Sequence, residues 1–104
     1  MIIYNITVKV AHEVHDDWMI WMNEIHIPAV METGFFVDNK FYKVLLQDES
    51  DGITYAIQYF CESMGNLQKY QGQHAPRLQK EHIDRYGEKC LTFRTLLETV
   101  PNQK

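Results

Sequence analysis

Apolar and polar residues alternate along the first ten residues, and a similar alternation returns in three later segments of the chain. Alternation predicts β-strands, because successive side chains of a strand point to opposite faces. Two longer segments between these strands carry apolar residues at helical spacing, which predicts amphipathic helices. The predicted strands are residues 2–10, 35–47, 53–61 and 89–100, and the predicted helices run from 15–17 to 34 and from 63 to 86.

One apolar stripe runs along the first predicted helix at positions i, i+3, i+4 and i+7. Its members are Trp18, Trp21, Met22 and Ile25. Pro28 interrupts this helix, because proline lacks an amide donor and its ring clashes with the carbonyl group four residues earlier, here that of Glu24. The pattern therefore predicts a helix that kinks or restarts near Pro28 and ends at Gly34.

The second predicted helix repeats this arrangement. Each helix contains a His-x-Pro triplet, at residues 26–28 and 74–76, and each ends at a glycine, Gly34 or Gly87. A strand-like segment precedes each helix. The chain therefore looks like a βαβ unit that is used twice, with the second helix also broken or kinked, near Pro76.

The element order β-α-β-β-α-β is the ferredoxin-like arrangement. It predicts an α+β fold with a four-stranded antiparallel sheet and both kinked helices on one face. The expected strand order is 4-1-3-2, with the first and third strands in the centre. A chain of this length is expected to form a single domain, residues 1–100, followed by a polar C-terminal tail at residues 101–104.

Two helices cover only one face of such a sheet, yet two of the strands are apolar on both faces. The third predicted strand carries Ile53, Tyr55, Ile57 and Tyr59 on one face and Ala56 and Phe60 on the other. The second predicted strand carries Phe35 and Phe41 on one face and Phe36 and Tyr42 on the other. A face in contact with water should be polar, so the open face is expected to pack on a second copy in a two-fold homodimer. The alternative is a monomer whose amphipathic sheet leaves tyrosine hydroxyls in water.

Composition and charge exclude several functions. The net charge is −4 and basic residues are interleaved with acidic ones, so no nucleic-acid partner is expected. No apolar run has the length of a membrane span, and the N-terminus lacks the layout of a signal peptide, so the expected location is the cytoplasm. Cys61 and Cys90 are isolated and are expected to be reduced, buried thiols.

Several motifs together resemble one bacterial family. MIIYNITV, W-x-x-W-M, HIPAVMETG, DGITYAIQYF and HAPRL…FRTL look like the family named domain of unknown function 4286, in the same order and over nearly the whole chain. More broadly the chain resembles the dimeric α+β barrel superfamily, which includes antibiotic-biosynthesis monooxygenases, heme-degrading monooxygenases, chlorite dismutases, muconolactone isomerases and EthD-type proteins. This resemblance implies a cavity between sheet and helices, in which members hold heme, aromatic polyketides or other ligands.

His26 and His74 are the first candidates for chemistry. A kink at each proline could open the space between helix and sheet and direct an imidazole into it, where histidine can serve as acid, base or ligand. Alternatively, each histidine satisfies backbone carbonyl groups that the proline leaves without a donor. The heme-degrading relatives use an asparagine on the first strand, a tryptophan, and a histidine on the second helix. Asn5 and His74 match two of these, but residues 53–85 contain no tryptophan, so no heme or other cofactor is predicted.

Aromatic residues supply the remaining candidates. Trp18 and Trp21 could stack on an aromatic ligand, or could simply be core residues. Tyr55 offers a hydroxyl group near a sheet-side cavity, as do Tyr4, Tyr42 and Tyr59, and together with Arg94 these could orient a polar group of an aromatic substrate. The same residue types are also common in dimer interfaces.

The other polar clusters are expected to form solvent-exposed surface. His12 and His15 lie among Glu13, Asp16 and Asp17, and a metal site would need a further ligand in fixed geometry, so no metal is predicted. An exposed helix face is predicted for the residues Glu81, His82 and Asp84. No nucleophile–base pair, phosphate-binding loop or carboxylate pair is recognisable, so no catalytic residue is assigned and it stays open whether the protein is an enzyme.

Three functional hypotheses remain. The first is a dimeric protein that binds a small apolar or aromatic ligand in a pocket between helices and sheet. The candidate binding residues are Asn5, Trp18, Trp21, His26, Tyr55 and His74. The second is a structural or regulatory homodimer without a ligand, and the third is a cofactor-independent or heme-related monooxygenase-like enzyme. A cavity of some hundreds of Å³ with His26 or His74 pointing into it would favour ligand binding, whereas a filled core would favour the structural role.

Overall fold

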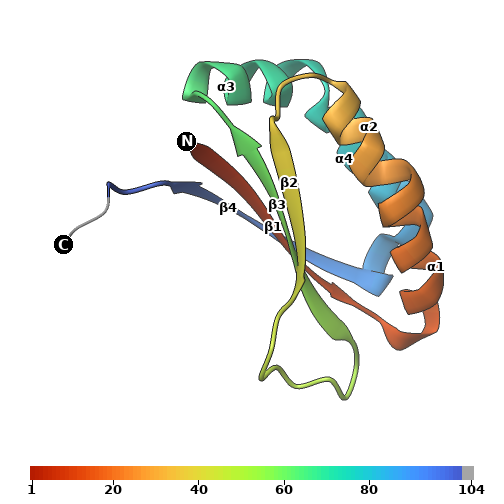
Figure 1. Cartoon of the computed structure of the whole chain (residues 1–104). Coiled ribbons are helices and arrows are strands. Elements are labelled where there is room, and N and C mark those ends of the chain that lie inside the picture. The colour runs from red at the N-terminus through yellow and green to blue at the C-terminus, as the bar shows by residue number, and fades with distance from the viewer. Residues whose placement is uncertain (102–104) are drawn as a thin grey trace.

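The computed structural model describes residues 1–101 and contains one four-stranded sheet (Figure 1). Its strands are β1 (Ile2–Val10), β2 (Asp38–Lys43), β3 (Ile53–Cys61) and β4 (Cys90–Glu98). The order is β2-β3-β1-β4 and all neighbours are antiparallel. This is the predicted order read from the opposite edge, so the ferredoxin-like α+β fold is confirmed.

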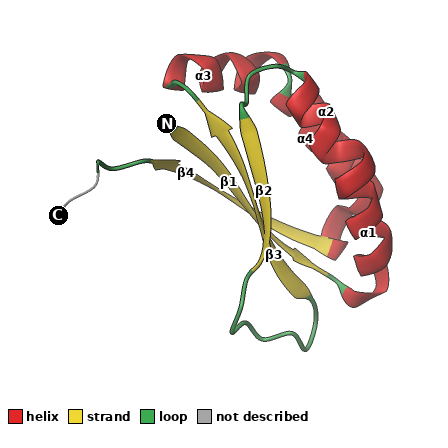
Figure 2. Cartoon of the chain, in the orientation of Figure 1, coloured by secondary structure: helices red, strands yellow, loops and turns green. Residues whose placement is uncertain are grey.

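The helices lie on one face of the sheet, and the other face has no helix over it (Figure 2). They are α1 (His15–Trp21), α2 (Ile27–Glu32), α3 (Met64–Gln73) and α4 (Ala75–Tyr86). Both expected interruptions are present. A π-helical segment, Met22–His26, separates α1 from α2, and His74 leaves the helical conformation between α3 and α4. None of the helices within residues 1–101 is long and apolar enough to cross a membrane.

Sequence signals explain where the helices begin and end. The hydroxyl group of Ser63 accepts a hydrogen bond from the Asn66 amide (3.1 Å), which caps the N-terminus of α3. Pro28 and Pro76 each lie in the first turn of the helix that follows an interruption, where a missing amide hydrogen costs least. Gly34 has φ of +81° just after α2, a conformation that glycine adopts without strain.

The core lies between the helices and the helix-facing side of β1 and β3. On β3 this side carries Tyr55, Ile57, Tyr59 and Cys61, all of them buried. Val10 of β1 and Leu78 of α4 are also fully or almost fully buried. Removal of this apolar surface from water is the main favourable contribution to folding.

The second strand is shorter than predicted. It begins at Asp38, so Phe35 and Phe36 precede it, and it ends at Lys43. Phe36 was expected on the same face as Tyr42, but it is buried in the core, where its ring lies 4.7 Å from that of Tyr70. The prediction was wrong at this position because side chains alternate between faces only within a strand, and the chain is still turning after Gly34.

The tail predicted at residues 101–104 lies outside the described residues except for Pro101. Residues 44–52 form the loop between β2 and β3, which extends beyond the sheet (Figure 1). Within it the Asp48 carboxylate accepts a hydrogen bond from the Ser50 amide (2.9 Å), and Lys9 forms an ion pair with Asp51. The first contact lies within the loop, and the ion pair fixes the end of the loop to β1.

Gly52→Ala is expected to destabilise the protein by about 1–3 kcal/mol, because it forces a backbone shift in a packed region. A Cβ atom at this position would lie 2.6 Å from the carbonyl oxygen of Val10, closer than atoms can approach. The matched control is Gly72→Ala in α3, where a Cβ atom meets nothing within 4 Å. This control should raise stability by about 0.5–1 kcal/mol. Urea unfolding measures both, and equal effects of the two substitutions would contradict the close approach of Gly52 to β1.

Candidate functional site

The π-helical segment Met22–His26 determines which side chains face the sheet. Within it the Ile27 amide donates to the carbonyl of Met22, five residues earlier, in place of the usual four. Pro28 accounts for this local change, because it has no amide hydrogen to donate and its ring is incompatible with a regular helix at this point. Each π-turn contains one more residue than an α-turn, so the inward-facing position moves along the sequence by one.

As a result His26, and not Ile25, faces the core. Ile25 was predicted to continue the apolar stripe, but its side chain is 55% exposed, whereas His26 is only 8% exposed. The prediction was wrong because it assumed regular helical spacing through residue 25. Isolated π-turns within helices occur frequently at functional sites, so His26, the last residue of this segment, is a candidate functional residue.

His26 lines a small cavity between the helices and the sheet. The strands contribute Tyr4, Tyr59, Thr92 and Arg94 to its wall, and the helices contribute Tyr70, Gln79 and His82. The cavity has a volume of about 30 Å³, which is room for roughly two water molecules. It is thus far smaller than a pocket for a large aromatic ligand, although His26 lies in its wall.

Two buried polar atoms at this cavity have no hydrogen-bond partner among the described residues. They are Nδ1 of His26 and the hydroxyl group of Tyr59. A buried polar group without a partner costs about 1–3 kcal/mol, and such groups are rare in native proteins. Both residues line the cavity, which has room for water.

His82 of α4 also lines the cavity, although the sequence reading placed it on an exposed helix face. The indole N–H of Trp18 donates to Nε2 of His82 over 3.0 Å. Since indole nitrogen can only donate, Nε2 must be the unprotonated nitrogen and neutral His82 must carry its hydrogen on Nδ1. The spacing could have revealed this, because His82 lies four residues after buried Leu78 and four before buried Tyr86.

Both histidines at the cavity are neutral at neutral pH. Burial, followed by nearby His82 and the charge of Arg94, lowers the pKa of His26 from 6.5 to about 4. Burial and Arg94 likewise lower the pKa of His82 to about 4. Burial also raises the pKa values of Tyr59 and Tyr70, so both remain protonated phenols that can donate hydrogen bonds.

The two tryptophans, predicted either to stack on a ligand or to fill the core, lie next to these histidines. Trp18 is fully buried, and Trp21 stacks on His26 with ring centres 4.8 Å apart. The guanidinium carbon of Arg85 lies over the ring of Trp21, 5.6 Å from the ring centre. Both indoles therefore support imidazoles of the site and do not themselves line the cavity.

Asn5 and His74 lie outside the cavity. Asn5 occupies an odd position on β1, so its side chain is on the sheet face without helices, where it donates to Thr7 (3.3 Å). His74 lies half-buried at the break between α3 and α4, and Arg77 donates to its Nδ1 (3.3 Å). The two residues that the resemblance suggested for heme chemistry therefore lie apart: Asn5 is on the sheet face without helices, and His74 is on the helical side of the sheet.

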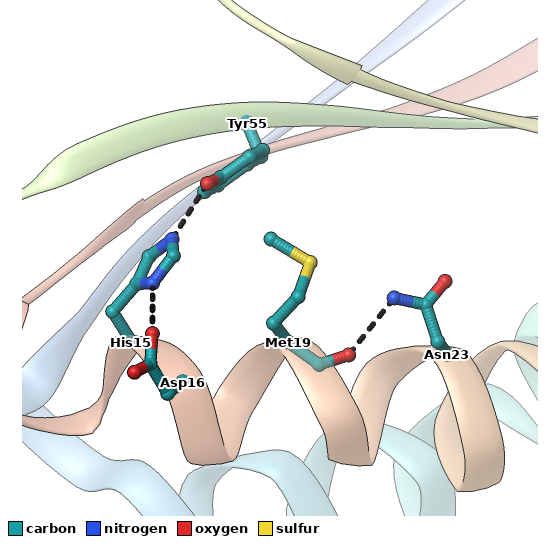
Figure 3. Close-up of polar contacts among 5 residues, drawn as sticks. All are labelled: His15, Asp16, Met19, Asn23 and Tyr55. Carbon is teal, nitrogen blue, oxygen red and sulfur yellow. Dashed lines mark hydrogen bonds and ion pairs between the residues drawn. The ribbon is translucent and has the colours of Figure 1, made fainter.

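Tyr55 belongs to a second polar cluster near the start of α1. Figure 3 shows His15 between Tyr55 of β3 and Asp16, with Met19 and Asn23 further along the helix. His15 Nε2 lies 2.6 Å from the Tyr55 hydroxyl, and His15 Nδ1 lies 3.0 Å from Asp16. Burial raises the pKa of Tyr55. The cluster connects the first turn of α1 to β3 and does not open onto the cavity.

Residues 1–101 contain no group of three or more histidine, cysteine or acidic side chains placed to hold a metal ion. The cavity itself combines apolar walls, phenol and imidazole hydrogen-bonding groups, and one guanidinium group. The wall therefore presents both hydrogen-bonding groups and a positive charge.

Comparison with solved structures supports the fold class. The chain superimposes on an ethyl tert-butyl ether degradation (EthD) family protein from Bacillus halodurans C-125 with a TM-score of 0.69 and 16% sequence identity, covering 96% of this chain and 100% of that one. At this identity the likeness concerns the fold alone, which is the antiparallel α+β fold that the sequence predicts. The model of the family named domain of unknown function (DUF4286) matches residues 1–100, so the chain belongs to that family. No curated protein is similar to the chain.

Proposed function

We propose that the protein is a homodimer that binds a small molecule in the cavity between its helices and sheet. The observation that carries this proposal is the pair of unpartnered buried atoms, His26 Nδ1 and the Tyr59 hydroxyl, in the wall of one cavity. A purely structural core would be more stable with apolar groups at these positions. The presence of two such groups in one cavity wall therefore supports a role in binding.

The size of the cavity limits the ligand. About 30 Å³ accommodates a group that replaces roughly two water molecules. A larger aromatic molecule would require the helices to move away from the sheet. The small volume is also the observation that favours the second candidate function, a structural or regulatory homodimer whose cavity contains only water.

The open sheet face supports the homodimer. Four large apolar or aromatic side chains on this face are exposed. They are Tyr42, Leu91, Phe93 and Leu97. Ile3 and Phe60 lie beside them and are half-buried. An apolar surface of this kind is typical of a protein–protein interface, and a second copy of the same face would cover it in a closed two-fold arrangement.

We further propose that residues 1–100 act as one domain in the cytoplasm. The family match over residues 1–100 supports the single domain. Cys61 and Cys90 are both free and buried, which is compatible with a reducing compartment.

Native mass spectrometry of protein purified gently from its own host, followed by a denatured measurement on the same sample, tests the proposal. We expect a dimer that carries a non-covalent small molecule in the native spectrum and loses it on denaturation. Tyr59→Phe should reduce the fraction with bound mass, whereas Tyr42→Phe, which removes a hydroxyl on the open face, should not. A dimer without bound mass would favour the structural role, and a monomer would contradict the assembly.

A further inference from the structure

The chemical character of the cavity wall indicates which ligands it can accept. Among the described residues that line it, none is aspartate or glutamate. Arg94 is the one cation among the lining residues. It is exposed to solvent on β4, and it forms no ion pair with any residue of the range 1–101. A positive group without a counter-ion beside a cavity attracts an anion.

Hydrogen-bond donors reinforce this preference. The Tyr59 hydroxyl has no partner and can donate into the cavity. The bond from Trp18 fixes the hydrogen of neutral His82 on Nδ1, which forms no hydrogen bond with the described residues. Three donors of different kinds, from Tyr59, His82 and Arg94, therefore lie around a site that lacks a carboxylate of its own.

Much of the remaining wall is apolar. Its aliphatic and thioether side chains, which lie beside the polar residues Tyr4, His26, Tyr70, Gln79 and Thr92, are those of Ile6, Val8, Met22, Val30, Ile57 and Leu78. A ligand that fits must therefore combine an anionic group with an apolar portion. Because the volume of about 30 Å³ holds roughly two water molecules, a short acid of about four or five non-hydrogen atoms requires a small movement of the surrounding side chains, and a longer acid requires a larger one.

Resting on the proposed function, we infer that the cavity takes a short-chain monocarboxylate. Its carboxylate lies among Tyr59, His82 and Arg94, and its alkyl group lies against the apolar wall. The carboxylate accepts charge-assisted hydrogen bonds, which are stronger than those between neutral groups. A neutral amide of the same shape lacks this gain, and a long-chain or aromatic acid is too large.

Titration with propionate, followed by tryptophan fluorescence, tests this inference directly, because both tryptophans contact the histidines of the site. At constant ionic strength we expect a saturable change with a Kd of about 1–10 mM, as suits a ligand of few atoms. Propionamide should bind at least about tenfold more weakly, as should benzoate. Propionate at about 50 mM should also raise the Tm, because it binds only the folded protein.

Arg94→Gln should weaken propionate binding at least about tenfold, since it removes the charge-assisted hydrogen bond. The matched control is Arg77→Gln on the outside of α4, where Arg77 faces Glu81, and it should leave binding unchanged. Equal binding of propionamide, or no effect of Arg94→Gln, would overturn the anion preference, and tighter binding of benzoate would overturn the short chain. Absence of both the fluorescence change and the Tm shift with propionate would overturn the inference as a whole. The proposed function would still stand if native mass spectrometry showed a different bound molecule.

Discussion

Phe93→Glu is expected to convert the protein from a dimer to a monomer. Phe93 is 68% exposed on β4, on the sheet face without helices, and Leu91 and Leu97 lie on the same face. In the proposed dimer this face is covered by a second copy, so the substitution would bury an unpaired carboxylate at the interface. The cost is several kcal/mol, which corresponds to an increase in the dimer dissociation constant of about a thousandfold or more.

Analytical ultracentrifugation of the wild type and the variant measures this change. The matched control is Ile83→Glu, because Ile83 is similarly exposed, at 61%, but lies on α4 on the helical side of the molecule. It should remain a dimer, and circular dichroism should show that both variants are folded. A wild-type monomer would refute the interface, as would a Phe93→Glu variant that dimerises as tightly as the wild type.

Acidification is expected to reduce the free energy of unfolding between pH 6.5 and 4. The folded-state pKa values of His26 and His82 are lowered to about 4, so the unfolded chain takes up protons in this range while the folded protein does not. The stability that these neutral histidines contribute is therefore fully present above pH 6.5 and is lost as the pH falls. Each histidine accounts for up to about 3 kcal/mol.

Two carboxylates affect the free energy of unfolding in a more acidic pH range. Hydrogen bonds from Ser50 and Lys9 lower the pKa values of Asp48 and Asp51 below 3.8, so their contribution is lost only at more acidic pH. Urea unfolding at pH 7 and pH 4.5 therefore reports mainly on the two histidines.

His82→Gln separates the two contributions. The glutamine side-chain oxygen can still accept the Trp18 N–H, but it does not titrate, so the loss of stability on acidification should be about half that of the wild type. A wild-type stability that does not change between pH 6.5 and 4.5 would contradict the neutral, buried histidines. So would a His82→Gln variant that loses as much stability as the wild type.

The sequence was sufficient to predict the topology of the sheet and the breaks in both helices. Strand order follows from alternation and element order, which depend on the whole chain and tolerate errors at single positions. The breaks follow from Pro28 and Pro76, whose missing amide hydrogens act locally whatever surrounds them. The open apolar face could also be predicted from β3, although β4 contributes more of it, through Leu91, Phe93 and Leu97.

The residues that line the cavity could be predicted from the sequence only in part. A proline predicts an interruption of the helix but not its form, and here the form is a π-turn that rotates Ile25 outward and His26 inward. His82 was missed because its neighbours Glu81 and Asp84 made the segment look exposed. Asn5 was a candidate by resemblance, but its position on β1 places it on the opposite face of the sheet.

A crystal structure that resolves ordered solvent would test the central claim most directly. We expect density in the cavity within hydrogen-bonding distance of both the Tyr59 hydroxyl and His26 Nδ1, from water or a small carboxylate. We also expect two copies packed through the sheet faces that carry Phe93. An empty cavity would contradict the binding site. So would a Tyr59 hydroxyl bonded to another protein group or a His26 ring turned outward, and a sheet face left in solvent would contradict the dimer.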